Sequence, residues 1–197
     1  GSIDGMLQLM LGKDSQALLA DRIAAVQAPG GWGALRILSE LIKRCDENLT
    51  VWVSDPTWAN HIPLIGNAGL TIQTYPYFDK ANASINFDGM VECLSQVKKG
   101  DVVLLHGCCH NPTGADLTNE QWQVVLELAQ KTGFIPFVDT AYQGFGDGLE
   151  EDAFGMRLLV NNLPEVIIAA SCSKNFGLYR ERVGIAVMVT ENSATRQ

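Results

Sequence analysis

The stretch Val166-Ile167-Ile168-Ala169-Ala170-Ser171-Cys172-Ser173-Lys174 decides the fold that the rest of the sequence must form. Its first five residues are an unbroken apolar run, which predicts a strand buried on both faces of a sheet. Lys174 follows the end of that strand, and Arg182 comes eight residues later. A lysine in this setting can form a Schiff base with an aldehyde, while hydroxyls and a guanidinium hold a phosphate beside it. A lone lysine is usually just solvated, so the other motifs must decide between the two interpretations.

Six further short apolar runs, each bounded by polar or turn residues, predict strands at 22–27, 51–53, 70–74, 102–105, 134–138 and 184–189. Helical spacing of apolar residues predicts helices at 6–12, 15–21, 34–44, 87–97 and 152–161, one soon after Trp58, and one from a Thr118–Gln121 capping box through Leu128. Such alternation predicts an α/β fold of three layers. In it, helices cover both faces of a seven-stranded, mainly parallel sheet.

Composition narrows the class of protein. The 197 residues carry a net charge of −8, which argues against general binding to nucleic acid or to an anionic membrane. No apolar run is long enough to span a bilayer, and no signal peptide opens the sequence. We interpret residues 1–5 as a cloning remnant and expect one domain over 6–197.

The cysteines do not indicate a disulfide framework. There are five, an odd number in a chain of this size, so we expect reduced thiols in a cytoplasmic protein. Cys108-Cys109-His110 invites a metal interpretation, but adjacent cysteines do not easily ligate one tetrahedral ion, and no second pair stands at a zinc spacing. We therefore expect no metal site.

Polar and aromatic residues follow the ends of several predicted strands, where parallel sheets bind ligands. Asp139 can keep a pyridine nitrogen protonated, and Asn111 and Tyr142 can hydrogen-bond a ring hydroxylate. Trp58 offers a flat face for stacking. Each residue alone has an ordinary explanation as a helix cap, a turn, a surface aromatic or a core side chain. Their joint placement, together with Lys174, favours a pyridine aldehyde cofactor.

A second set of residues can hold a phosphate. The glycine-rich turn 29–33 exposes backbone N–H groups where a helix begins, although a tight connector would need the same glycines. The candidate donors are the amides around Gly31 and the side chains of Ser171, Ser173 and Arg182.

Five stretches, in this order, resemble the aspartate/aromatic aminotransferases, which are fold-type-I enzymes dependent on pyridoxal 5'-phosphate. They are residues 29–31, 54–61, 106–114, 139–145 and 171–182, and the resemblance covers nearly the whole chain after residue 5.

The resemblance implies roles for single residues. Lys174 would form the Schiff base and shuttle the proton, with Asp139 and Tyr142 as further catalytic residues, and His110 would lie behind Asp139. The implied cofactor-binding residues are Gly31, Trp32, Trp58, Asn111, Asp139, Tyr142, Ser171, Ser173, Lys174 and Arg182. The family also implies amino acid and 2-oxo acid substrates, a homodimer, and cis bonds at Asp55-Pro56 and Asn111-Pro112.

The sequence departs from the family in two ways. Trp32 stands where the family usually has Ser or Thr, whose hydroxyl touches the phosphate, so Trp32 either weakens cofactor binding or points elsewhere. Cys172 replaces a common Tyr, a tolerable change if only the flanking serines face the phosphate. Family members are also considerably longer, with an N-terminal arm and a small domain whose arginine binds the substrate carboxylate. We therefore expect the cofactor-binding large domain alone, with little or no transaminase activity of its own.

Two alternatives remain open. One is a non-catalytic α/β module for binding or assembly, derived from an aminotransferase, which Trp32 and the truncation favour. The other keeps the fold and cofactor but catalyses a lyase or decarboxylase reaction, because fold alone does not define chemistry. The preference between aspartate and aromatic substrates stays open as well.

Overall fold

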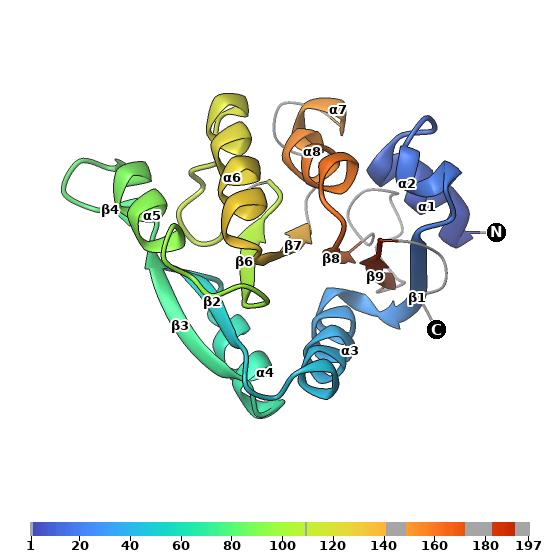
Figure 1. Cartoon of the computed structure of the whole chain (residues 1–197), viewed down its shortest axis with the longest axis horizontal. Coiled ribbons are helices and arrows are strands. Elements are labelled where there is room, and N and C mark those ends of the chain that lie inside the picture. Colours follow the sequence, from blue (N-terminus) through green and yellow to red (C-terminus); the bar gives the residue numbers. More distant parts are fainter. Residues whose placement is uncertain (1, 109, 141–148, 172–182, 192–197) are drawn as a thin grey trace.

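The computed structural model describes residues 2–108, 110–140, 149–171 and 183–191. A seven-stranded sheet in the order β1-β9-β8-β7-β6-β2-β3 runs through its centre (Figure 1). Its strands are β1 (Ile23–Pro29), β2 (Thr50–Asp55), β3 (Thr71–Pro76), β6 (Val102–His106), β7 (Ile135–Thr140), β8 (Val166–Ser171) and β9 (Val183–Val189). Six of them run in the same direction, since only β9 is antiparallel to its neighbours, β8 and β1. The predicted mainly parallel α/β fold is confirmed.

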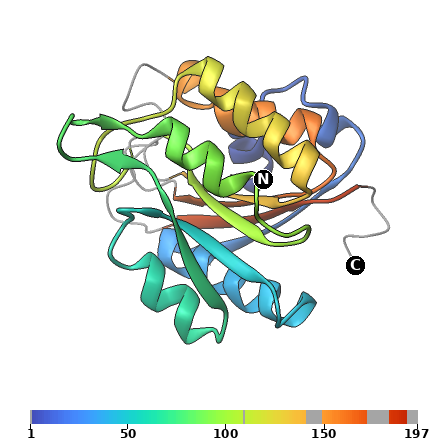
Figure 2. The same ribbon diagram turned by 60° about the vertical axis from the view of Figure 1, so that its left-hand side comes forward.

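Helices cover both faces of the sheet, so the molecule has three layers (Figure 2). One face carries α3 (Gly30–Cys45) and α4 (His61–Asn67). The other face carries α1 (Ser2–Leu11), α2 (Gln16–Leu19), α5 (Phe87–Leu94), α6 (Asn119–Thr132) and α8 (Phe154–Asn162). The four-residue helix α7 (Leu149–Asp152) precedes α8. Within the part of the chain that the structure describes, no helix has both the length and the apolar character needed to cross a bilayer.

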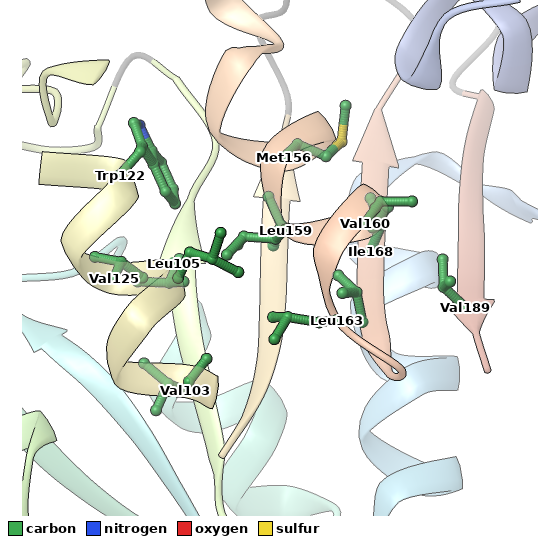
Figure 3. Close-up of a cluster of buried hydrophobic side chains, with 14 of the residues drawn as sticks. Val103, Leu105, Trp122, Val125, Met156, Leu159, Val160, Leu163, Ile168 and Val189 are labelled. Atoms are coloured by element: carbon green, nitrogen blue, oxygen red, sulfur yellow. The ribbon is translucent and has the colours of Figure 1, made fainter. Parts of the chain in front are cut away.

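The buried strands supply side chains to both layers of helices. Val103 and Leu105 belong to the cluster under α6 and α8, whereas Val102 and Leu104 belong to the cluster under α3 and α4. Alternate residues of a strand point to opposite faces, so an unbroken apolar run is what a sheet covered on both sides requires. Figure 3 shows the first cluster, in which Trp122 of α6 and Leu159 of α8 pack over the sheet.

Local sequence sets the ends of α6. The hydroxyl of Thr118 accepts from the N–H of Gln121 at 3.1 Å, and the side chain of Gln121 accepts from the N–H of Thr118 at 2.9 Å. This capping box is the predicted one. The helix ends at Thr132 and is capped by Gly133, whose φ of +80° suits a residue without a Cβ.

Several elements differ from the sequence-based expectations. Residues 2–5, which we excluded as a cloning remnant, lie in α1, and Ile3 packs against the core. Helix α3 begins at Gly30 rather than at residue 34, because packing against β8 and β9 outweighs the poor helix propensity of glycine. A small hairpin of β4 (Phe78–Asp79) and β5 (Ser84–Ile85) was not predicted, since two-residue strands leave no readable pattern.

Candidate functional site

The candidate site lies at the edge of the sheet where β2, β6, β7 and β8 end. Strands β6 and β7 are paired in parallel there, with His106 opposite Asp139. Trp58 and Asn111 follow the ends of β2 and β6, and Ser171 is the last residue of β8. The shared placement of these predicted residues at one edge is therefore a property of the fold.

Asp139, on strand β7, is held by a histidine from helix α4. Nε2 of His61, the first residue of α4, lies 2.6 Å from Oδ2 of Asp139. The His61 side chain is fully buried, and that of Asp139 is 15% exposed. Trp58 packs edge-on against the same imidazole, with the ring centroids 5.2 Å apart.

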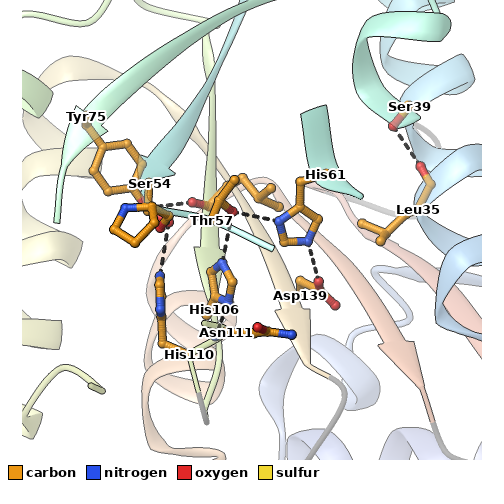
Figure 4. A network of polar contacts seen from close by, with 12 residues as sticks. Leu35, Ser39, Ser54, Thr57, His61, Tyr75, His106, His110, Asn111 and Asp139 are labelled. Atoms are coloured by element: carbon orange, nitrogen blue, oxygen red, sulfur yellow. Dashed lines mark hydrogen bonds and ion pairs between the residues drawn. The ribbon is translucent and has the colours of Figure 1, made fainter. Parts of the chain in front are cut away.

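The contact continues into a chain of hydrogen bonds that we call the Asp139 network: Asp139, His61, Thr57, His106 and the backbone of Asn111 (Figure 4). The hydroxyl of Thr57 lies 2.8 Å from Nδ1 of His61 and 3.3 Å from Nε2 of His106. The N–H of Asn111 donates to Nδ1 of His106 at 3.4 Å.

The backbone N–H of Asn111 sets the direction in which the hydrogen bonds of this network run. Because Asn111 donates to Nδ1 of His106, a neutral His106 carries its proton on Nε2 and donates to Thr57. Thr57 then donates its own proton to Nδ1 of His61, which leaves the Nε2 proton of His61 for Asp139. Asp139 thus accepts a hydrogen bond from His61.

The electrostatic surroundings of His106 support this assignment. Burial lowers the pKa of His106 well below its ordinary value, and the neighbouring His110 and His61 lower it further. Burial is the larger cause, because a buried imidazolium loses its hydration. A ring that stays neutral keeps an acceptor nitrogen for Asn111, so burial preserves the network near neutral pH.

The expectation that His110 lies behind Asp139 is wrong, since His61 occupies that position. Both ring nitrogens of His110 are already bonded, Nε2 to Ser54 at 3.0 Å and Nδ1 to Thr113 at 2.7 Å. No ring nitrogen remains for the carboxylate. His110 instead stacks on His106, with ring centroids 4.0 Å apart.

The expected phosphate end brings two distant segments together. A Cβ built on Gly31 would lie 3.1 Å from Cβ of Ser171, so the first turn of α3 sits directly against the end of β8. On β9, a Cβ at Gly184 would lie 2.0 Å from the carbonyl oxygen of Gly30, so only glycine permits this approach. Pro29, at the N-cap, has no side-chain acceptor for the N–H groups of the first turn.

Trp32 points away from this end of the site. Its side chain is 58% exposed and lines a hollow of about 180 Å³ with Arg36 of α3 and Leu64 of α4. Of the two sequence-based expectations for Trp32, the structure agrees with a side chain that points elsewhere.

Four predicted site residues lie outside the described residues: Tyr142, Ser173, Lys174 and Arg182. Among the described ones, the structure brings Asp139, Asn111 and Trp58 to one place, and Gly31 and Ser171 to another part of the same edge. The bonds Asp55-Pro56 and Asn111-Pro112 are both cis, as expected.

Sequence reasoning missed His61, Thr57 and His106, although all three lie in the stretches that carried the resemblance. A signal was available, since each of the three histidines in the sequence follows a predicted strand end. The sequence does not show which histidine reaches Asp139, because that depends on how the turn after β2 folds back over β7.

The family model described as aminotransferase class I and II matches residues 5–195. The chain is 52% identical over 192 residues to an aromatic-amino-acid aminotransferase of Paracoccus denitrificans, covering 98% of this chain and 48% of the relative. It is 50% identical to an aspartate aminotransferase of Haemophilus influenzae, covering 94% of this chain and 47% of the relative. The chain thus spans about half the length of the curated relatives it matches.

Solved structures give the same result. An aromatic amino acid aminotransferase from Burkholderia cenocepacia superposes with a TM-score of 0.94 at 44% identity, covering 98% of this chain and 48% of that one. An aromatic-amino-acid aminotransferase from Burkholderia pseudomallei, described as covalently bound to pyridoxal phosphate, superposes with a TM-score of 0.94 at 41% identity and the same coverage.

Proposed function

Since the chain belongs to the family of class I and II aminotransferases, we propose that it forms the cofactor-binding domain of an aminotransferase. The complete enzyme moves an amino group between aspartate or an aromatic amino acid and a 2-oxo acid. The observation that carries the proposal is the Asp139 network, which holds the Asp139 carboxylate in place at the ligand-binding edge of the sheet.

The described residues fit pyridoxal 5'-phosphate. One part of the edge brings together the Asp139 carboxylate, the backbone of Asn111 and the Trp58 ring, a set that suits a protonated pyridine with a ring oxygen. Another part presents the first turn of α3, whose N-cap residue Pro29 makes no side-chain cap bond, beside Ser171, and this arrangement suits a phosphate. When bound, the cofactor supplies an electron sink for the carbanion formed at the substrate Cα.

Each residue of the chain then has a separate task. Asp139 would hold a proton on the pyridine nitrogen, and His61 orients the Asp139 carboxylate through its hydrogen bond. Trp58 covers the ring and excludes water from one face. Asn111 and Tyr142 bind the ring oxygen. Lys174 would hold the cofactor aldehyde through its amine, and the same amine, when free, would serve as the group that moves a proton.

The proposal also covers the phosphate-binding residues, the cellular compartment and the oligomeric state of the complete enzyme. Ser171, Ser173, Arg182 and the amides near Gly31 bind the phosphate. We place the protein in the cytoplasm, in keeping with the free thiols of Cys45 and Cys93. We also propose a homodimer for the complete enzyme. Since the chain spans about half the length of its relatives, we assign turnover to the complete enzyme and cofactor binding to this chain.

The test is to add pyridoxal phosphate to the chain, record the visible spectrum, reduce with borohydride and locate the modified lysine by mass spectrometry. We expect a yellow adduct trapped on Lys174 and lost in Lys174→Ala. Lys13→Ala, which removes a lysine from the loop between α1 and α2, is the matched control and should leave the adduct intact. An adduct spread over surface lysines, or none at any concentration, would reject the cofactor site and favour a non-catalytic module.

A further inference from the structure

His110 is bonded through all four of its polar groups. Its N–H donates to Oδ1 of Asp116 at 2.7 Å, and its carbonyl accepts from the N–H of Gly114 at 2.7 Å. Its ring nitrogens contact Ser54 at 3.0 Å and Thr113 at 2.7 Å. His110 is only 3% exposed. Few side chains are held from so many directions, and this one immediately precedes Asn111.

The protons of these bonds are also determined. Ser54 donates its single hydroxyl proton to the carbonyl of Pro56 at 2.7 Å, so Nε2 of His110 is the donor to Ser54. The N–H of Ala115 donates to the Thr113 hydroxyl at 3.2 Å, which leaves the proton of Thr113 for Nδ1 of His110. Burial lowers the pKa of His110 to about 4, so near neutral pH the ring is neutral and has one tautomer, with its proton on Nε2.

The His110 ring is in contact with two other rings. Tyr77 stacks on His110 with the centroids 4.2 Å apart and the planes 19° apart. His106 lies against the ring with the centroids 4.0 Å apart and the planes 33° apart. His106 in turn meets His61 edge-on at 5.2 Å. The position of the His110 ring thus limits where the His106 ring can lie.

The longest link of the Asp139 network is the one that His110 controls. The N–H of Asn111 reaches Nδ1 of His106 across 3.4 Å, beyond the usual range of about 2.7–3.2 Å for such bonds. A further shift of a few tenths of an ångström in either residue would remove the donor that assigns every proton in the network. His110 fixes both ends, because it is covalently joined to Asn111 and stacked on His106.

We propose that His110 is a positioning residue which, held by Ser54 and Thr113, keeps Asn111 and His106 aligned so that the Asp139 network retains a single arrangement of protons. The proposal deepens the function proposed above and rests on it only where cofactor binding is concerned. His110 does not touch Asp139 and acts through His106 and Asn111.

The test uses long-range ¹H–¹⁵N NMR spectra of the whole cofactor-free chain, in which there are only three histidines. In the wild type we expect Nδ1 to be the unprotonated nitrogen in all three rings. His110→Phe keeps a ring for stacking but loses both side-chain bonds. We expect it to shift or broaden the Nδ1 signals of His106 and His61 as a second tautomer becomes populated. His110→Gln, whose amide nitrogen can replace Nε2 toward Ser54, should restore part of the wild-type pattern.

A control separates positioning from loss of stability. Val125→Ala removes fully buried methyl groups from α6, in the main core cluster, and should destabilise the chain without changing the histidine signals. If His110→Phe and Val125→Ala both lower stability and neither alters the signals of His106 and His61, His110 is only a structural residue and the proposal is wrong.

Cofactor titration is the second readout. If the wild type binds pyridoxal phosphate, we expect His110→Phe to bind it about tenfold more weakly, the effect of losing one good hydrogen bond in the site. Unchanged affinity in His110→Phe would contradict the inference. If the wild type binds none, the proposed function fails, whereas the NMR comparison still tests the role of His110.

Discussion

Nε2 of His61 lies 2.6 Å from Oδ2 of Asp139, although 78 residues separate them in the sequence. The histidine opens a helix on one face of the sheet, and the aspartate sits near the end of a central strand. A fully buried imidazole thus donates to a nearly buried carboxylate, a charge-assisted contact that is stronger than one between neutral groups.

Replacing His61 should weaken cofactor binding. In His61→Phe the ring volume is kept but Asp139 loses its donor. Since a hydrogen bond to a charged group contributes about 1.5–3 kcal/mol, we expect an affinity for pyridoxal phosphate at least about tenfold lower in a visible-absorbance titration. Ile62→Ala, at the exposed neighbouring position, is the matched control and should bind as the wild type does. Equal affinities in the two variants would show that the contact does not support binding.

Asp101 should be a major stabilising residue away from the site. Its buried carboxylate accepts from the N–H of Thr50 at 3.0 Å, the indole of Trp52 at 3.2 Å and the N–H of Lys98 at 3.3 Å. Asp101→Ala leaves these donors without their acceptor, and we expect a loss of about 3 kcal/mol in the free energy of unfolding, measured with urea. Asp46→Ala, which removes one exposed turn contact, should change little.

The stability of the chain should fall in mild acid. Burial lowers the pKa of His110 from its ordinary 6.5 to about 4, and it also lowers the pKa of His106. Below pH 6.5 the unfolded chain binds protons that the folded chain does not, so stability present above pH 6.5 is lost as the pH falls towards 4. Urea unfolding from pH 7.5 to pH 4 should show this decline, and His110→Gln should make it shallower. A variant that declines as steeply as the wild type would assign the loss to other groups.

Trp32 should be dispensable for folding. Because its side chain is mostly exposed, we expect Trp32→Thr to change the free energy of unfolding by no more than about 0.5 kcal/mol. Because the side chain at this position points away from the phosphate end of the site, the new hydroxyl should leave the affinity for pyridoxal phosphate unchanged. Thermal unfolding and cofactor titration measure the two effects. Reduced affinity would mean that the indole itself contributes to the site.

Much of the fold could be predicted because single residues carried local signals. The apolar run 102–105 indicated a strand covered on both faces, and Thr118 with Gln121 marked the start of α6. These features depend on neighbours in the sequence, so periodicity and capping chemistry suffice to find them.

The partner of Asp139 could not be predicted in this way. His61 and His110 both follow strand ends, and only the three-dimensional path of the chain decides which one reaches the carboxylate. Two hydroxyls hold the two imidazoles in different places, since Thr57 bonds to His61 and Ser54 bonds to His110. The contribution of Ile3 to the core was not predicted for another reason. Residues that look like a cloning remnant can still pack against a core.

The pairing of β1 with β9 has a consequence for synthesis on the ribosome. Ile23 is paired with Val189, and β9 is the strand to which β1 is bonded in the described sheet. Strand β1, which is synthesised early, can therefore join the sheet only after β9 has been made. Until then the apolar side of α3 also remains uncovered. Contacts so distant in sequence slow folding and leave apolar surface exposed during translation. A nascent chain of this kind is a natural client for chaperones.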